Sequence, residues 1–238
     1  MFDASTFIGL WWVGLIAGGF NMALTVVTHT SQAYGRDITR CVQSVNAALV
    51  DDCRHVVFEL PGDNESYIQG RYDAMKLGGW VAFVDDDDWI PPNVLKHCMA
   101  AIKANSDVGV VFTRCVQLLP DGSESLEQEC HGYIDVAIRP TALHNIACIN
   151  TARVTPRALA LAKQHGCGID WIMKAEAALT HGAVHVPTVG YYYDCSHGQS
   201  RRTTNSVVTA NYGRSMTIIA QTLRTWKTKN GKIPSFKL

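Results

Sequence analysis

The residues most able to do chemistry are four consecutive aspartates, Asp85–Asp88, which directly follow the apolar stretch Trp80–Val84. Adjacent carboxylates repel one another, and each loses hydration if it is buried. One interpretation is a solvent-exposed loop. The other is a site for Mg²⁺ or Mn²⁺, because these cations take carboxylate oxygens as ligands and compensate their negative charge.

Polar residues also end two other stretches that have the composition of strands. Residues 23–30 end in Thr28-His29-Thr30, and residues 54–60 carry Glu59 near their end and are soon followed by Asp63. Ligands bind parallel α/β sheets beyond the carboxyl ends of the strands. The three polar groups are therefore expected at one edge of a sheet, which favours metal binding by the aspartates over a plain loop.

The chain between these groups alternates strand and helix patterns. Apolar β-branched stretches predict strands, and apolar residues three or four positions apart predict helices. The predicted strands are 23–30, 54–60, 80–84 and 108–119, and the predicted helices are 36–49, 65–78 and 91–102. This alternation is typical of an α/β fold in which helices flank a mostly parallel sheet. With 238 residues, of which 47% are hydrophobic, the chain is expected to form a single domain.

Residues 7–27 are almost entirely apolar, which raises the question of a membrane anchor at residues 4–20. A span needs about 20 apolar residues, and the last part of this apolar run is needed for the strand at 23–30. No Lys or Arg precedes the run to orient it in a membrane. Residues 1–21 are therefore predicted to be an extension, with translation starting at Met22 or a weak anchor as alternatives.

The eight cysteines are scattered, and no two of them form a CxxC pair. In a chain of this length, that distribution is typical of reduced cysteines in a cytosolic protein rather than of a disulfide framework. The protein is accordingly predicted to be cytoplasmic.

Charge is distributed unevenly along the chain, although the formal net charge is zero. Asp194 is the last acidic residue, and eight of the 21 Lys and Arg residues follow it, so residues 195–238 carry a formal charge of +8. Residues 205–238 are predicted to form a basic amphipathic helix and tail. The apolar face of that helix consists of Val208, Tyr212, Met216, Ile219, Leu223 and Trp226. Two roles stay open for it: packing on the acidic body of the protein, or contacting a polyanion.

Several segments, in order along residues 22–202, resemble the landmarks of one enzyme family. They are GRYDAMKLGGWVAFVDDDDWIPPNVL, VGVVFTRCVQLLPDGS, GCGIDWIMKAEAAL and YYYDCSHGQSRR. A lone Asp-x-Asp is weak, but the whole series at fitting intervals resembles a GT-A-fold glycosyltransferase of the family-2 type. The resemblance implies a GT-A domain over residues 22–204, with a Rossmann-like sheet. It also implies an inverting transfer of a sugar from a nucleotide-sugar donor, most often a UDP-sugar, with Mn²⁺ or Mg²⁺ as cofactor.

The resemblance also assigns roles within the acidic run. Asp85 and Asp87 would form the Asp-x-Asp, with Asp85 facing the donor and the metal and Asp87 as the principal metal ligand. Because four aspartates follow one another, the register is open by one, and Asp86 is included among the donor contacts. His197 would complete the metal or diphosphate site, and its alternative is a hydrogen-bonded surface histidine.

The resemblance also implies further residues that hold the donor. Arg71 and Arg201 are candidate contacts of the diphosphate, since a guanidinium group matches phosphate oxygens with paired hydrogen bonds. The alternative for Arg71 is a charge on a helix surface. Thr28 and Thr30 end the first strand and are expected near the nucleotide.

One departure from the family concerns the base of the nucleotide. The family commonly carries paired aspartates after the second strand, whereas this sequence reads FELPGDNES there. Glu59 or Asp63 would have to take that role, which leaves open whether the base is the expected uracil.

Asp170 is the predicted catalytic residue. An inverting transfer needs a base that removes the proton of the acceptor hydroxyl as it attacks the anomeric carbon, and Asp170 matches the position of the carboxylate that does so in the family. The alternative is a helix N-cap, a role that aspartate favours and that does not exclude catalysis. Trp171 is expected either to stack on the acceptor or to lie in the core.

The acceptor and the function class keep alternatives. Residues 130–165 are expected to help form the acceptor site, and the acceptors considered are a hydroxymethylated base in DNA, as in compact phage-type enzymes, and a cell-envelope glycan or lipid-linked acceptor. The other functions are a nucleotidyltransferase and a non-catalytic module that binds a nucleotide-sugar or nucleic acid. The first of these predicts a glycine-rich loop after the first strand, where THTSQAYGR has one glycine. No oligomeric state is predicted.

Overall fold

The computed structural model describes residues 23–31, 33, 35–126, 133–140, 142–143, 145–195, 206–226 and 236–237. The predicted N-terminal extension, residues 1–21, lies outside these described residues. Among the helices that are described, none combines the length and the apolar character needed to cross a bilayer.

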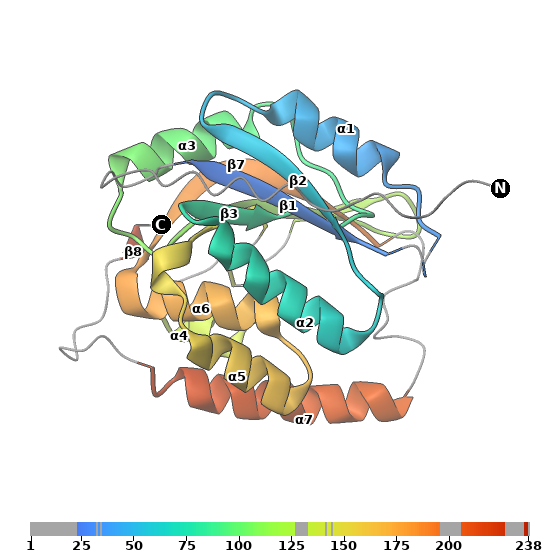
Figure 1. Ribbon diagram of the computed structural model, residues 1–238, viewed down its shortest axis with the longest axis vertical. Coiled ribbons are helices and arrows are strands. Elements are labelled where there is room, and N and C mark those ends of the chain that lie inside the picture. The colour runs from blue at the N-terminus through green and yellow to red at the C-terminus, as the bar shows by residue number, and fades with distance from the viewer. Residues whose placement is uncertain are drawn as a thin grey trace, which may run out of the picture.

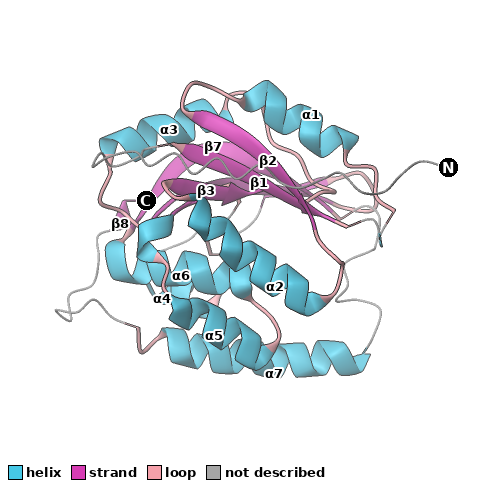
Figure 2. Ribbon diagram, in the orientation of Figure 1, coloured by secondary structure: helices cyan, strands magenta, loops and turns pink. Residues whose placement is uncertain are grey.

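A central sheet organises the described part of the chain (Figure 2). Its strands lie in the order β2-β1-β3-β6-β4-β7-β8, with β5 paired to β4. Most neighbours run parallel, whereas β6 runs antiparallel to both β3 and β4, and β5 runs antiparallel to β4. The strands are β1 (Leu24–Thr30), β2 (Cys53–Glu59), β3 (Trp80–Phe83), β4 (Val110–Leu118), β5 (Glu124–Leu126), β6 (Ala147–Asn150), β7 (Ala183–Asp194) and β8 (Phe236–Lys237).

Helices cover both faces of the sheet (Figure 1). Helices α1 and α3 lie on one face, and α2, α4, α5, α6 and α7 lie on the opposite side. The helices are α1 (Thr39–Ala48), α2 (Asn64–Asp73), α3 (Val94–Ala104), α4 (Tyr133–Ile138), α5 (Pro156–His165), α6 (Ile169–His181) and α7 (Ser206–Leu223), with 3₁₀ turns η2 (Ala74–Leu77), directly after α2, and η3 (Thr151–Arg153).

The strands of the sheet contribute alternate side chains to two cores. In β1, Val26 packs in the core under α1 and α3, whereas Val27 packs in the core under α2 and α6. In β3, Ala82 and Phe83 divide in the same way. This follows from the two-residue period of a strand, and it explains why strands buried on both faces appear as continuous apolar runs in the sequence.

The predicted fold class is confirmed: the chain forms a mixed α/β domain with a mostly parallel sheet between helices. The four predicted strands correspond to β1, β2, β3 and β4, and the three predicted helices correspond to α1, α2 with η2, and α3. Strands β5, β6, β7 and β8 and helices α4 and α5 were not predicted. Strand β6 is the segment ACIN, Ala147–Asn150, which lacks the aromatic residues that mark β3, WVAF, as a strand.

The C-terminal helix α7 packs on the domain. Ile219 and Leu223 are fully buried, and the ring of Trp226 lies 4.1 Å from the guanidinium carbon of Arg157 on α5. Burying side chains such as these stabilises the fold by about 1.5–3 kcal/mol each. The apolar face expected in residues 205–238 is therefore used, in the described part of the helix, to cover α4, α5 and α6.

Helix α6 approaches the sheet closely because residue 109, just before β4, is a glycine. A Cβ atom at Gly109 would lie 2.0 Å from the backbone oxygen of Ala177 in α6. Backbone atoms cannot turn aside as the end of a flexible side chain can, so only glycine permits this spacing. The close packing sets the spacing between the sheet and α6, the helix that carries Asp170 in its first turn.

We expect Gly109→Ala to destabilise the protein by about 1–3 kcal/mol, because overpacking forces backbone shifts. Urea unfolding followed by circular dichroism would measure the change. Gly213→Ala is the matched control, because a Cβ at Gly213 in α7 would meet no atom within 4 Å and alanine favours a helix by up to about 1 kcal/mol. Equal stability of the two variants would contradict the packing argument.

Candidate active site

Three of the predicted site residues meet at the carboxyl edge of the sheet. Asp85 follows β3, Arg71 lies in the last turn of α2, and Asp170 lies in the first turn of α6. The Nη2 atom of Arg71 donates a hydrogen bond to Oδ1 of Asp85, and its Nε atom lies 3.4 Å from Oδ1 of Asp170. One guanidinium group therefore joins the acidic run to the predicted base.

Arg71 is buried but remains charged. Only 2% of its side chain is exposed, and its guanidinium carbon lies 4.9 Å and 4.5 Å from the ring centres of Tyr67 and Phe83. Burial by itself lowers the pKa of Arg71, but the carboxylates of Asp170 and Asp85 raise it well above its ordinary value. A buried cation of this kind is stable only while its anionic partners stay in place.

Asp170 is held from the side of α2. The hydroxyl of Tyr67 donates a 2.8 Å hydrogen bond to Oδ2 of Asp170. Oδ1 is inaccessible to solvent, although 39% of the whole side chain is exposed, so the exposed surface belongs to its other atoms. Burial raises the pKa of Asp170, but the charge of Arg71 and the bond from Tyr67 outweigh it and lower the pKa below its usual value. The carboxylate is therefore ionised at neutral pH.

Asp170 is not the N-cap of α6. That position belongs to Gly168, whose φ of 77° is in the left-handed region. Asp170 lies in the first turn, where a negative charge interacts favourably with the helix dipole. Trp171 lies in the core, and its indole nitrogen donates to the carbonyl of Val136 at 2.8 Å.

The four aspartates of the acidic run have alternating environments. Asp85 and Asp87 expose 37% and 36% of their side chains, whereas Asp86 exposes 7% and Asp88 is fully buried. Arg36, from the loop before α1, lies 2.7 Å from Asp86 and 2.8 Å from Asp87. The four like charges are therefore separated into three environments. Asp86 and Asp87 pair with Arg36, Asp85 pairs with Arg71, and Asp88 lies in the core.

Asp88 ties the acidic run to β7. The hydroxyl of Tyr191 donates to Oδ2 of Asp88 at 2.7 Å and accepts from the backbone N–H of Asp85 at 3.0 Å. The backbone N–H of Asp194 donates to Oδ1 of Asp88 at 2.8 Å. Burial, and then the charge of Asp85, raises the pKa of Asp88 to about 8. Asp88 therefore acts as a structural residue beneath the exposed carboxylates.

Arg40 in α1 supports the same turn from outside. It donates to the backbone oxygen of Asp87 at 2.6 Å and to the carboxylate of Asp194 at 2.7 Å. Its guanidinium carbon lies 3.9 Å above the ring of Trp89, which stacks at 5.3 Å on Tyr192 of β7. Arg40 therefore links α1, the acidic turn and the end of β7.

Four residues of the site were not predicted from the sequence: Tyr67, Tyr191, Arg36 and Arg40. Spacing gives a signal for three of them: Tyr67 lies four residues before the predicted Arg71, and Arg36 and Arg40 lie four residues apart at the start of the predicted helix 36–49. Residues four apart share one face of a helix. No comparable signal marks Tyr191, which is one of three consecutive tyrosines.

The remaining described donor candidates lie around the ends of β1 and β2. Glu59 ends β2 and is exposed, and Thr30 pairs with it at the end of β1. Thr28 is fully buried, and its hydroxyl lies 3.0 Å from Nε2 of His55. The structure therefore places Thr30 and Glu59 at the same edge as Asp85, while the hydroxyl of Thr28 is engaged inside the fold.

Asp63 has a structural role at the start of α2. It is the N-cap, and its two carboxylate oxygens accept from the backbone N–H of Ser66 at 2.8 Å and from the Ser66 hydroxyl at 2.6 Å. These bonds lower the pKa of Asp63. Capping of this kind stabilises the start of a helix.

His29 contributes an uncharged ring beside Arg71. It lies between Phe58 and Phe83, with both ring-centre distances at 5.7 Å. Burial and the nearby charge of Arg71 lower the pKa of His29 to about 3. The imidazole is therefore neutral across the physiological range.

The carboxylates of the acidic run fit a hard divalent cation in their chemistry. Within the described residues, no three His, Cys, Asp or Glu side chains are grouped as a metal site, and His197 and Arg201 lie outside those residues. Asp85 and Asp87 are nevertheless both partly exposed. Burial and the charge of Asp85 raise the pKa of Asp87. A bound cation would offset this repulsion between the carboxylates. Mg²⁺ and Mn²⁺ often take one or two carboxylates and complete their shell with phosphate and water.

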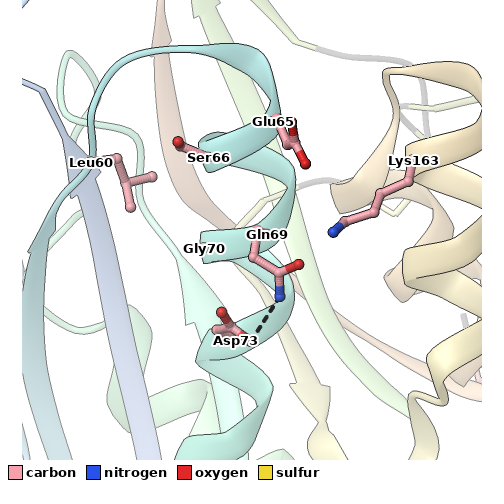
Figure 3. Close-up of a pocket in the computed structure, with 7 residues that line it drawn as sticks. All are labelled: Leu60, Glu65, Ser66, Gln69, Gly70, Asp73 and Lys163. Carbon is pink, nitrogen blue, oxygen red and sulfur yellow. Dashed lines mark hydrogen bonds between the residues drawn. The ribbon is translucent and has the colours of Figure 1, made fainter.

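A shallow groove of about 390 Å³ lies elsewhere, along α2 (Figure 3). Figure 3 shows Lys163 of α5 extending toward α2, where Glu65 and Gln69 line the groove. None of Arg71, Asp85 and Asp170 lines it. The joined carboxylates at the sheet edge, rather than this groove, are therefore the candidate active site.

A scan of the sequence against models of protein families finds no match, and a search of curated proteins finds none either.

Solved structures of a glycosyltransferase, S. aureus TarS, have a similar fold. The crystal structure of TarS 1–349 aligns with a TM-score of 0.53 and 14% identity, covering 85% of this chain and 72% of that one. Its complex with UDP-GlcNAc aligns with a TM-score of 0.52 and 16% identity, covering 83% and 65%. A longer TarS structure, at 15% identity and a TM-score of 0.53, is covered over 45% of its length. At these identities the likeness establishes the fold alone.

We expect Tyr191→Phe to lower the free energy of unfolding by about 1–3 kcal/mol, because it leaves a buried oxygen of Asp88 and the N–H of Asp85 without their shared partner. Urea unfolding would measure the loss. Tyr192→Phe is the control, since phenylalanine retains the ring that stacks on Trp89. A Tyr191→Phe variant as stable as this control would show that the bridge to Asp88 contributes nothing.

Proposed function

We propose that this protein is an inverting glycosyltransferase that transfers a sugar from a nucleotide-sugar, a UDP-sugar, to an acceptor hydroxyl. One observation carries the proposal: Arg71 contacts both Asp85 and Asp170 at the carboxyl edge of an α/β sheet. That edge is where such sheets bind ligands. The fold supports it, because structures of TarS with this fold include complexes with UDP and UDP-GlcNAc.

Asp170 is proposed to be the general base. Its lowered pKa makes it ionised at neutral pH, so it can accept a proton without first losing one. As the acceptor oxygen bonds to the anomeric carbon, its proton passes to the Asp170 carboxylate. The bond between that carbon and the diphosphate oxygen breaks, and its electron pair leaves with the nucleoside diphosphate.

Arg71 is proposed to stabilise the leaving diphosphate. Its guanidinium group is fixed in a buried position, and a preorganised cation needs little rearrangement when negative charge develops. Arg201 and His197 are proposed as further contacts on the basis of the family resemblance. Asp85 and Asp87 are proposed to hold Mn²⁺ or Mg²⁺, which supplies additional positive charge at the leaving group when it is bound.

The nucleoside is proposed to lie over the ends of β1 and β2. Thr30 and Glu59 are the side chains best placed for it, because both end strands at that edge. Asp63 is less available, since both its oxygens accept bonds from Ser66. Asp86, which pairs with Arg36 at 2.7 Å, is proposed to affect the donor through the shape of the turn.

The acceptor is proposed to be a hydroxyl on a polyanion or on an envelope glycan. The basic C-terminal segment supports a polyanion, because eight Lys and Arg and no acidic residue follow Asp194. Purified protein with UDP-sugars should therefore be assayed against DNA with hydroxymethylated bases, cell-envelope glycans and lipid-linked acceptors.

We expect Asp170→Asn to reduce sugar transfer by at least about 100-fold, because general bases contribute 10²–10⁴-fold, while UDP affinity stays within about threefold. Transfer assays and calorimetric titration with UDP would measure the two effects. Asp107→Asn, on an exposed turn, is the matched control and should behave as wild type. A fully active Asp170→Asn variant would exclude Asp170 as the base.

We expect UDP binding to require Mn²⁺ in the wild-type protein and to weaken by about 10-fold or more in Asp87→Ala, because a principal metal ligand is lost. Calorimetric titration with UDP, with and without Mn²⁺, would measure both. Asp107→Ala is the control. Equal UDP binding with and without the metal would contradict the proposed metal site. If UDP, GDP, CDP and TDP all fail to bind in Mn²⁺, the proposed donor is wrong.

A further inference from the structure

The orientation of the Asp170 carboxylate depends on a residue outside the reaction chemistry. A general base must lie within hydrogen-bond reach of the proton that it removes, and misplacement by about 1 Å can cost 100-fold in rate. Asp170 lies in the first turn of α6 with 39% of its side chain exposed, so its surroundings alone do not confine it. Some directional contact has to set which oxygen faces the acceptor.

Arg71 does not provide that direction. Its Nε atom lies 3.4 Å from Oδ1 of Asp170, and neither atom makes a hydrogen bond within the described structure. The contact is therefore a charge interaction, which falls off slowly with distance and tolerates rotation of the carboxylate. The directional hydrogen bond of Arg71 goes to Asp85 instead.

Tyr67 does provide direction. Its hydroxyl donates to Oδ2 of Asp170 at 2.8 Å, a distance typical of a well-formed O–H···O bond. The ring of Tyr67 packs against the guanidinium group of Arg71, with 4.9 Å between the guanidinium carbon and the ring centre. Tyr67 and Arg71 are one helical turn apart, so α2 presents the hydroxyl and the cation together to α6.

The protonation state of Tyr67 suits this role. Burial, and also the negative charge of Asp170, raise the pKa of Tyr67 well above its ordinary value, although Arg71 opposes them. The phenol therefore keeps its proton and remains a donor. A carboxylate oxygen has two lone pairs, so the bond from Tyr67 leaves one lone pair on Oδ2 for the proton of an acceptor hydroxyl.

We infer that Tyr67 is a positioning residue, which holds Oδ2 of Asp170 in the orientation that accepts the acceptor proton. The inference rests on the proposed function, in which Asp170 is the general base, and adds to it the residue that aims the base. Tyr67 itself neither gains nor loses a proton in the reaction.

The charged and titratable groups around Asp170 determine the expected pH dependence. Arg71 and Tyr67 face it from α2, His29 from β1, and Lys174 from its own helix. The bond from Tyr67 lowers the pKa of Asp170, so removing the hydroxyl raises it. Because the base must be ionised, the acidic limb of the rate profile then moves to higher pH. His29, with a pKa of about 3, does not titrate in that range.

The test is the variant Tyr67→Phe, which keeps the ring on Arg71 and removes the hydroxyl. We expect kcat to fall by about 10–100-fold, UDP affinity to stay within about twofold, and the acidic limb of kcat to move to higher pH. Tyr72, five residues further along α2, is half-buried. Tyr72→Phe is therefore the matched control, and its kcat and pH profile should match those of the wild type. Wild-type kcat and an unmoved limb in Tyr67→Phe would overturn the inference.

The double variant Tyr67→Phe with Asp170→Asn separates this inference from the proposed function. If Tyr67 acts through Asp170, the double variant has the same kcat as Asp170→Asn alone. A further loss of kcat from Tyr67→Phe in the double variant would overturn the inference. If Asp170→Asn alone keeps full activity, the proposed base is wrong and the inference falls with it. If Asp170→Asn is inactive and Tyr67→Phe behaves as wild type, only the inference fails.

A second substitution at the same position tests the inference if Tyr67→Phe is poorly folded. Site-specific 3-fluorotyrosine at position 67 keeps the bond and makes the hydroxyl a stronger donor. We expect it to move the acidic limb to lower pH, opposite to Tyr67→Phe, with no loss of stability in urea unfolding. An unmoved limb in the folded fluorotyrosine protein would overturn the inference.

Discussion

The buried guanidinium group of Arg71 is the feature on which the rest of the site depends. A cation with 2% of its side chain exposed needs anions beside it, and loss of one partner of a buried pair typically costs about 3–5 kcal/mol. Asp85 meets that need at Nη2 of Arg71, and Asp170 meets it at Nε. Since the first follows β3 and the second begins α6, one electrostatic requirement holds three elements of the fold in a single arrangement.

The acidic run illustrates a second constraint, which is that four adjacent carboxylates cannot share one environment. The fold resolves their repulsion by alternation: Asp85 and Asp87 stay partly exposed, while Asp86 and Asp88 are buried. Arg36 compensates two of the charges, and Tyr191 links Asp88 to β7. The buried contacts of Asp86 and Asp88 thus hold Asp85 and Asp87 in place. The same logic applies to Asp170, where Arg71 supplies charge and Tyr67 supplies direction.

Much of the fold could be predicted because its signals are local. Strand β1 and strand β3 are apolar on both faces, and the helices between the predicted strands repeat apolar residues at helical spacing. Strand β6 could not be predicted, because it forms only where β3 and β4 lie on either side of it. Its four residues pair antiparallel with both of these strands. Tyr191 was missed for a related reason: its role depends on a backbone N–H and a carboxylate more than 100 positions away in the chain.

By itself, the sequence determined the α/β class, the strand ends at which polar residues collect, and the identity of Asp85, Arg71 and Asp170 as candidates. The fold class and the polar strand ends follow from periodicity and residue chemistry, whereas the choice of Arg71 and Asp170 came from the resemblance of the sequence to a glycosyltransferase family. The tertiary structure alone decided that one guanidinium group joins Asp85 to Asp170, that alternate aspartates are buried, and that Tyr67 bonds to the base. These are contacts between segments separated by up to about 100 residues, and they exist because packing of α2 and α6 on one face of the sheet brings their side chains within a few ångströms.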